Sequence, residues 1–194
     1  MPSQARTSLR SLLLRTLLVA AVMASASFLV ANNTRAAFVS TTDNAANAWE
    51  AGSVTISDDD GGVAMFDVGP LLPGDTGENC IEVTYDGNVT SGVDIAMYAA
   101  TSGNLAGDVD VTVEIGTGGG FGDCTGFAGS SAFTGTLTGL STTHFDFASG
   151  ITMWSPGATG QSRVVRIAWT LGVDTLSSQQ GEVAGATFTW QSQG

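Results

Sequence analysis

Lysine is absent from this chain, and its six basic residues are all arginine. Four of them lie in the first 36 residues, so only Arg163 and Arg166 oppose the eighteen acidic residues, all of which follow. The part after residue 36 therefore carries a formal charge of −16, a field that repels nucleic acids and anionic lipids. Without lysine, the chain also cannot be a pilin that is cross-linked through lysine isopeptide bonds.

Histidine and cysteine are too scarce for the common metal chemistries. A zinc protease needs two histidines one helical turn apart, and this chain has only His144. Two cysteines and one histidine also fall short of a four-ligand structural zinc site. Because the chain has neither a Gly-x-Ser-x-Gly elbow nor a phosphate-binding glycine loop, we predict no catalytic residues and a protein that is not an enzyme.

Long hydrophobic runs are confined to one stretch near the start. Three arginines precede the nearly unbroken apolar residues 16–31, and a polar stretch then ends at Ala36. This pattern is typical of a secretory signal peptide, so residues 1–36 are predicted to be a leader. Cleavage after Ala26 would leave an apolar end on the mature chain, so cleavage after Ala36 is preferred. An uncleaved signal anchor is the alternative.

Cys80 and Cys124 are an even pair in a chain that we expect to be exported, which favours a disulfide. It would close a loop of about 45 residues, for which the chain-entropy model gives roughly 4 kcal/mol. A pair of buried free thiols is the alternative.

Polar and apolar residues alternate repeatedly from residue 50 to the end. This period of two is typical of strands with one buried and one wet face. Turn signals rich in glycine, proline and aspartate separate the segments. The sequence predicts an all-β domain over residues 50–194, an antiparallel β-sandwich of jelly-roll type with at most one short helix. The alternating segments are residues 54–56, 81–85, 93–99, 109–115, 165–171 and 187–191, with a shorter one around Met65.

Two stretches depart from this pattern. Residues 138–153 alternate poorly and are predicted to form a crossing loop, with a short helix from about Ser141. Residues 116–122 are glycine-rich and predict a hairpin or loop tip. Trp169 and Trp190 lie on the apolar positions of their segments and are predicted to be core.

Two features suit a secreted binding module. Asp58, Asp59 and Asp60 offer carboxylates, the ligands that calcium prefers, but their spacing does not match the alternating calcium loop. A solvated acidic turn is the other interpretation, and no other cofactor is expected. Trp154 is the one tryptophan predicted to lie in a loop, where it would be available to a carbohydrate.

Three motifs follow the predicted leader in order. Together, over about residues 37–85, they resemble the TasA/camelysin family of secreted bacterial proteins. They are the aromatic start Ala37-Phe38-Val39, the segment 47–56 that contains Trp49 and Ala51-Gly52, and the turn Pro73-Gly74-Asp75 before the strand with Cys80.

The resemblance implies a jelly-roll sandwich like the subunits of extracellular biofilm-matrix fibres. In that family the mature N-terminal segment adds as a strand to the next subunit, which would make residues 37–49 a donor segment. Its assembly residues would be Ala37, Phe38, Val39 and Trp49. Pairing of this segment within its own domain is the alternative.

These observations lead to an expected function. We expect an exported bacterial protein, secreted or on the cell surface, that is structural and associates with itself or with another matrix or surface protein. No membrane segment is expected after cleavage, and nucleic acid is excluded by charge. A binding module for carbohydrate or calcium is the alternative. Some relatives of the family are named metalloendopeptidases, but the ligands for that chemistry are not visible in this sequence.

Overall fold

The computed structural model describes residues 15–21 and 51–194. Residues 15–21 are helical, and no helix in these two ranges is long and apolar enough to cross a membrane. The chain divides into two compact units, Met1–Trp49 and Glu50–Gly194. The predicted cleavage points and the predicted donor segment lie outside the described residues.

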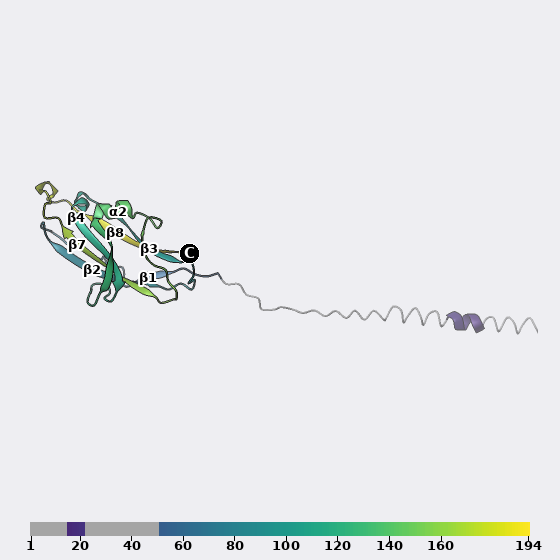
Figure 1. Cartoon of the computed structure of the whole chain (residues 1–194). Helices are drawn as coiled ribbons and strands as arrows, with labels where there is room; N and C mark the ends of the chain where they lie inside the picture. The colour runs from purple at the N-terminus through teal and green to yellow at the C-terminus, as the bar shows by residue number, and fades with distance from the viewer. Residues whose placement is uncertain (1–14, 22–50) are drawn as a thin grey trace, which may run out of the picture. The chain divides into compact units, whose positions relative to one another are not determined.

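Residues 51–194 form eight strands, one α-helix and two 3₁₀ turns (Figure 1). The elements are β1 (Ile56–Asp58), β2 (Thr76–Tyr85), β3 (Asp94–Ser102), η1 (Asn104–Gly107), β4 (Val109–Thr117), β5 (Ala128–Thr136), α2 (Leu137–Thr143), β6 (Ile151–Trp154), β7 (Ser162–Leu171), η2 (Ser177–Gln179) and β8 (Gly185–Gln193).

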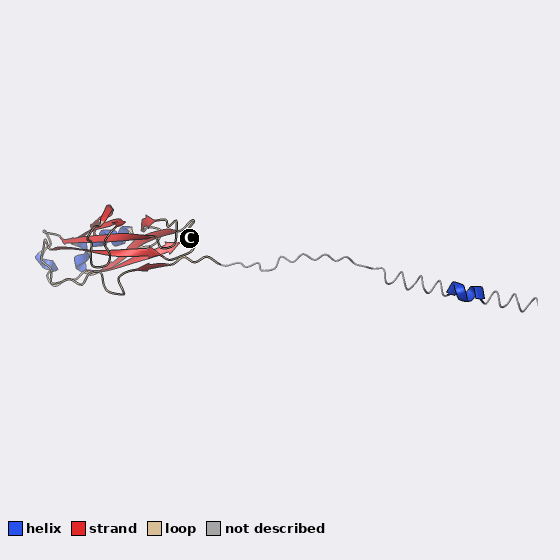
Figure 2. Cartoon of the chain, turned by 90° about the horizontal axis from the view of Figure 1, so that it is seen from below, coloured by secondary structure: helices blue, strands red, loops and turns tan. Residues whose placement is uncertain are grey.

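The strands build two antiparallel sheets of unequal width. One sheet has five strands in the order β1-β2-β7-β4-β5, and the other has three in the order β6-β3-β8. Every strand pairing within each sheet is antiparallel, and the strands run lengthwise through the domain (Figure 2). The predicted all-β antiparallel sandwich is confirmed, while its jelly-roll connectivity stays a prediction.

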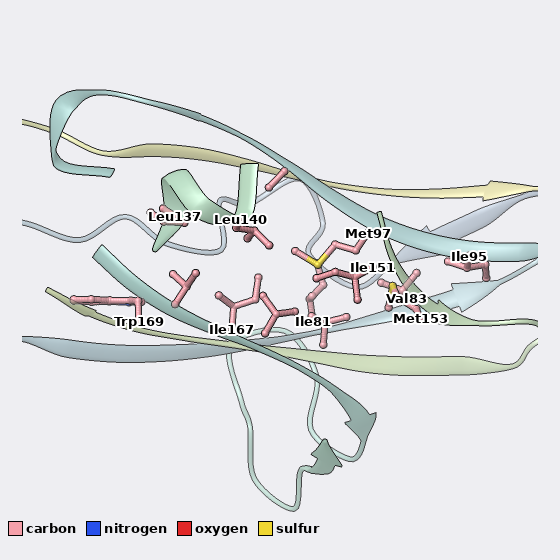
Figure 3. Packing of buried hydrophobic residues seen from close by; sticks show 14 of the residues in the cluster. Ile81, Val83, Ile95, Met97, Leu137, Leu140, Ile151, Met153, Ile167 and Trp169 are labelled. Carbon is pink, nitrogen blue, oxygen red and sulfur yellow. The ribbon is translucent and has the colours of Figure 1, made fainter. Parts of the chain in front are cut away.

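Alternation along each strand places one face in the core. In β7, Val165, Ile167, Trp169 and Leu171 are buried, whereas Arg166 between them lies on the outer face. Figure 3 shows side chains from the two layers meeting, with Ile81 and Ile167 below Leu140 and Met97. Burial of each such aliphatic side chain contributes about 1.5–3 kcal/mol, so the period of two fixes which face of each strand is inside.

Cys80 and Cys124 form the predicted disulfide. It ties β2 to the loop between β4 and β5, with the two Cα atoms 5.3 Å apart and a sequence separation of 44. Cys80 has no exposed surface. The glycine-rich residues 116–122 end β4 and lead into this loop, as the predicted hairpin tip requires.

Two predictions of secondary structure were wrong, and so was the predicted position of Trp154, which is described below. The apolar residues around Met65 form no strand, because residues 59–75 are an irregular loop. The short helix begins at Leu137 rather than Ser141, because the Thr136 side chain caps it by accepting a hydrogen bond from the Gly139 N–H.

Trp154 is not in a loop. It ends β6, pairs with Ile95 of β3 and is only 8% exposed. The Arg163 guanidinium lies 5.8 Å from the centre of its ring. Trp154 is therefore covered and cannot act as a carbohydrate platform.

Candidate assembly groove

The narrower sheet ends in an open strand edge. Within residues 51–194, β8 pairs with β3 along its whole length and with no strand on its other side. β1 and β2 of the wider sheet lie opposite that free edge, since residues from all three strands line one cavity. An unpaired edge presents a row of backbone N–H and C=O groups that can accept another strand.

Two neighbouring cavities run along this edge, and we call them together the β8 groove. The larger has a volume of about 910 Å³, with Ile81, Ile167 and Trp169 of the wider sheet on its floor. The smaller, of about 350 Å³, is lined by β1, β2 and β8. Phe188 and Trp190 of β8 line both, so the cavities adjoin. The groove is therefore lined by apolar side chains, of which Phe188 and Trp190 are partly exposed and those on the floor are buried.

Trp190 also carries an unsatisfied polar group. Its Nε1 is buried and has no hydrogen-bond partner among the described residues. A buried donor without an acceptor costs about 1–3 kcal/mol. A chain that rearranged this wall of the groove and supplied an oxygen would remove that cost.

One loop beside the larger cavity contains a turn that is fixed by its own hydrogen bonds. In the predicted turn Pro73-Gly74-Asp75, the Leu72 N–H donates to the Asp75 carboxylate at 2.7 Å, and the Asp75 N–H donates to Leu72 O at 2.9 Å. Gly74 has a φ of 93°, a conformation that favours glycine. The turn at residues 73–75 thus forms part of one side of the groove.

The loop between β7 and β8 forms another side of the groove. Its Glu182 carboxylate accepts a hydrogen bond from the Asn104 side chain at 2.9 Å, and Val183 O accepts one from the Leu105 N–H at 3.2 Å. These bonds hold the loop on η1. The groove is therefore bounded by two fixed loops rather than by a closing strand.

Large apolar side chains line the mouth of the larger cavity and face solvent. Five residues of the two loops, which we call the apolar rim, are each more than half exposed, and a cluster of this kind marks an interaction site. They are Val63 (60%), Val68 (54%), Leu72 (71%), Leu176 (69%) and Val183 (69%).

The described chain begins at the other end of the sandwich. Ser53 O accepts hydrogen bonds from the N–H groups of Asn88 and Val89, and the Asn88 side chain accepts one from the Ser53 N–H at 2.6 Å. These bonds attach the chain beside Tyr85, at the end of β2, whereas the apolar rim lies by its beginning at Thr76. About 30 Å of strand separates the two ends.

Charge around the groove is of one sign. The charged side chains that line it are Asp58, Asp60, Asp67 and Glu182, with no basic residue among the lining residues. Burial raises the pKa of Asp58, and a hydrogen bond and the negative charge of Asp60 raise it further. An incoming segment rich in carboxylates would therefore meet repulsion here.

The arginines of the domain are engaged away from the groove. Arg166 pairs with Glu114 and, at 3.5 Å, with Glu78 on the outer face of the wider sheet, and it lies 5.1 Å from the ring of Phe127. Neither it nor Arg163 offsets the acidic groove.

Two members of the aspartate run that was a calcium candidate, Asp59 and Asp60, bind backbone N–H groups. The two Asp59 oxygens accept hydrogen bonds from the backbone N–H groups of Glu82 and Phe121, at 2.8 and 2.7 Å. One Asp60 oxygen accepts from the Gly62 N–H. Across the described ranges, no group of three or more histidine, cysteine or acidic side chains could hold a metal ion, so calcium gains no support.

His144 closes the loop after α2. Its Nδ1 is 2.6 Å from Ser149 O, its carbonyl accepts from the Ala99 N–H, and its ring meets Phe133 edge-on at 5.7 Å. Asp146 bonds to the Ser149 hydroxyl, which lowers the pKa of that carboxyl. These contacts give His144 a structural role in fixing the loop after α2.

No family model matches this sequence, and no curated protein matches it.

Sequence reasoning placed the disulfide and the turn at Pro73-Gly74-Asp75, but it missed the groove. Residues 37–49 lie outside the described residues, so their role as a donor segment stays a prediction. One signal was present: Val63, Val68 and Leu72 are apolar residues in a segment punctuated by glycine and proline.

Proposed function

We propose that the chain is an exported, non-enzymatic structural protein whose copies assemble outside the cell by strand donation. Residues 37–49 of one copy would add to the free edge of β8 in another, as in fibre subunits of the TasA/camelysin family that the sequence resembles. The single observation that carries the proposal is the free β8 edge beside the β8 groove, whose larger cavity has a volume of about 910 Å³.

Residues 37–49 have the length that pairing with the β8 edge requires. Thirteen residues in extended conformation span about 43 Å, and the nine residues of β8 span about 30 Å. The segment is therefore long enough to pair with the whole edge. Backbone hydrogen bonds would give affinity, and alternate side chains would fill the groove.

Composition supports the same occupant. The segment brings apolar and aromatic side chains at both ends, Phe38 and Val39 at one and Trp49 at the other. It has one carboxylate before Glu50, at Asp43, which limits repulsion from the acidic groove.

The test compares residues 37–194 with residues 50–194, both oxidised at Cys80 and Cys124. The shorter form retains the buried hydrophobic cluster, all of which lies after residue 80. We expect filaments by negative-stain electron microscopy from the longer form only. If both forms stay monomeric and folded by circular dichroism, across salt and calcium concentrations, self-assembly is wrong.

A peptide experiment separates donation between copies from pairing within one. Added in excess, a synthetic peptide of residues 37–49 should cap the groove of 37–194 and shorten its filaments. A scrambled peptide of the same composition is the matched control. Filaments unaffected by either peptide would contradict donation into an open groove.

A further inference from the structure

We infer that the donated segment runs antiparallel to β8, with Trp49 of the donor seated in the apolar rim of the acceptor. The inference rests on the proposed function and adds two details to it: the direction of the donated segment along β8 and the residue that anchors the segment. Direction matters because it decides whether assembly closes on itself or continues.

The two ends of the domain are different surfaces. We call the end with the apolar rim the rim end; there β2 begins at Thr76 and β8 begins at Gly185. We call the other the root end; there the described chain starts at Ala51, and β8 finishes at Gln193. Figure 1 marks the C-terminus at the root end. Because hydrogen bonds to Asn88 fix Ser53 at the root end, a donated segment always leaves its own copy from there.

A segment parallel to β8 would place residue 49 at the root end of the acceptor. The root ends of the two copies would then face each other, and each could donate to the other. Such a two-fold contact closes after two copies. The apolar rim, at the far end, would stay in water.

A segment antiparallel to β8 would place residue 49 at the rim end. The root end of the donor would then face the rim end of the acceptor, a head-to-tail contact that leaves a free rim at one end and a free root at the other. Repetition of this contact gives an open chain rather than a closed pair. It also covers the apolar rim, whose five side chains are 54–71% exposed in the single domain.

Two observations select the antiparallel direction. The apolar rim is a cluster of exposed aliphatic side chains that only this direction buries. All described strand pairs are antiparallel, β3 with β8 included, so the added strand continues the pattern of the sheet.

Trp49 is the side chain with the size to fill the rim. It stands next to the point where the described chain begins, so its indole would reach the rim as the donor's root end arrives. A tryptophan buries roughly 150–250 Å² in such a contact. Aromatic side chains already line this cavity, namely Trp169 of β7 and Phe188 of β8.

Cross-linking between singly substituted copies of 37–194 tests the direction. One copy carries Glu50→Cys, and its partner carries either Leu72→Cys at the rim end or Gln193→Cys at the root end. Each pair is mixed and treated with a short bis-maleimide. Leu72 and Gln193 are both exposed, so neither change disturbs the core.

We expect cross-linked pairs from Glu50→Cys with Leu72→Cys and not with Gln193→Cys. The reverse result would overturn the antiparallel direction while leaving strand donation in place. Filaments without either cross-link would overturn the inference as well. No filaments from unsubstituted 37–194 would instead mean that the proposed function fails.

Substitutions on the two surfaces test the anchor. Trp49→Ala in the donor, or Leu72→Ser with Val183→Ser in the rim, should raise the concentration needed for filaments about tenfold or more. Phe145→Ser is the matched control, because Phe145 is 61% exposed and lies outside the groove. If the rim variant assembles like the control, the rim does not hold the donor.

Discussion

At the level of single residues, the buried side chains of β7 contribute to the hydrophobic core that stabilises the sandwich. Ile167 has no exposed surface and packs between the two sheets (Figure 3). Ile167→Ala should lower the free energy of unfolding by about 2–5 kcal/mol, since it removes buried methyl groups and leaves a cavity. Urea denaturation of residues 50–194 measures the change.

The control for that experiment is Val173→Ala. Val173 is 74% exposed, so this variant should stay within about 0.5 kcal/mol of the parent. A loss at Ile167 no larger than the loss at Val173 would contradict the assigned core.

The raised pKa of Asp58 predicts how that residue affects stability. The folded state binds this proton more tightly than the unfolded state, whose pKa is 3.8. Ionised Asp58 therefore opposes folding at neutral pH, and the effect disappears as the pH falls through the folded-state pKa towards 3.8. We expect Asp58→Asn to resist urea better than the parent at neutral pH, with a difference that shrinks in acid.

Asp110→Asn controls for the loss of one negative charge, because Asp110 is exposed on the outer face of β4. If both variants gain equally at every pH, the environment of Asp58 is not the cause.

At the scale of elements, the N-terminus of α2 depends on one hydroxyl. The Thr136 side chain accepts the Gly139 N–H at 3.0 Å. Thr136→Ala should cost about 1 kcal/mol of unfolding free energy, whereas Thr136→Ser keeps the oxygen and should cost less. Equal losses from the two variants, measured by urea denaturation, would show that the cap does not stabilise the helix.

The disulfide makes a larger contribution than any single cap. It closes a long loop, since 44 positions separate Cys80 from Cys124, and replacing both by alanine should lower stability by roughly 4 kcal/mol. Thermal or urea unfolding of the double variant, compared with the oxidised parent, checks this. A difference below about 1 kcal/mol would mean that the cross-link constrains the unfolded chain little.

The strands that were predictable are those with one buried and one wet face. β7 and β4 alternate because they lie inside the wider sheet with the core on one side. β5 was not predicted, since it is an edge strand with mostly exposed glycine, serine and alanine on both faces. A strand that buries little leaves little pattern in its sequence.

The segment around Met65 was predicted to be a strand but is a loop. Its apolar residues pattern like a strand, but they lie in the loop that lines the groove. Sequence periodicity reports which side chains avoid water and not which partner covers them. The groove could not be predicted for the same reason, because it depends on β8 having no second neighbour in the described domain.

At the scale of the whole molecule, assembly must overcome charge. The rim end carries Asp67, Asp174 and Glu182, and the root end carries Asp86 and Asp94. A head-to-tail contact brings these acidic ends together within a chain of formal charge −16 after residue 36. Added salt screens that repulsion.

We therefore expect residues 37–194 to form filaments at lower protein concentration when salt is raised from about 0.05 M to about 0.5 M. Sedimentation of filaments over a salt series gives the dependence. Sodium and calcium salts compared at equal ionic strength separate screening from a specific effect of calcium. Weaker assembly at high salt would contradict contact between two acidic ends.

The central claim is that the free edge of β8 receives residues 37–49 of another copy, and hydrogen exchange tests it most directly. Backbone amides of residues 185–193 would be followed by mass spectrometry in 50–194 alone and with the 37–49 peptide or its scrambled control. We expect the peptide to slow exchange in β8 and to leave β5, an edge strand of the wider sheet, unchanged. Unchanged exchange in β8 at saturating peptide, or equal slowing by the scrambled peptide, would contradict it.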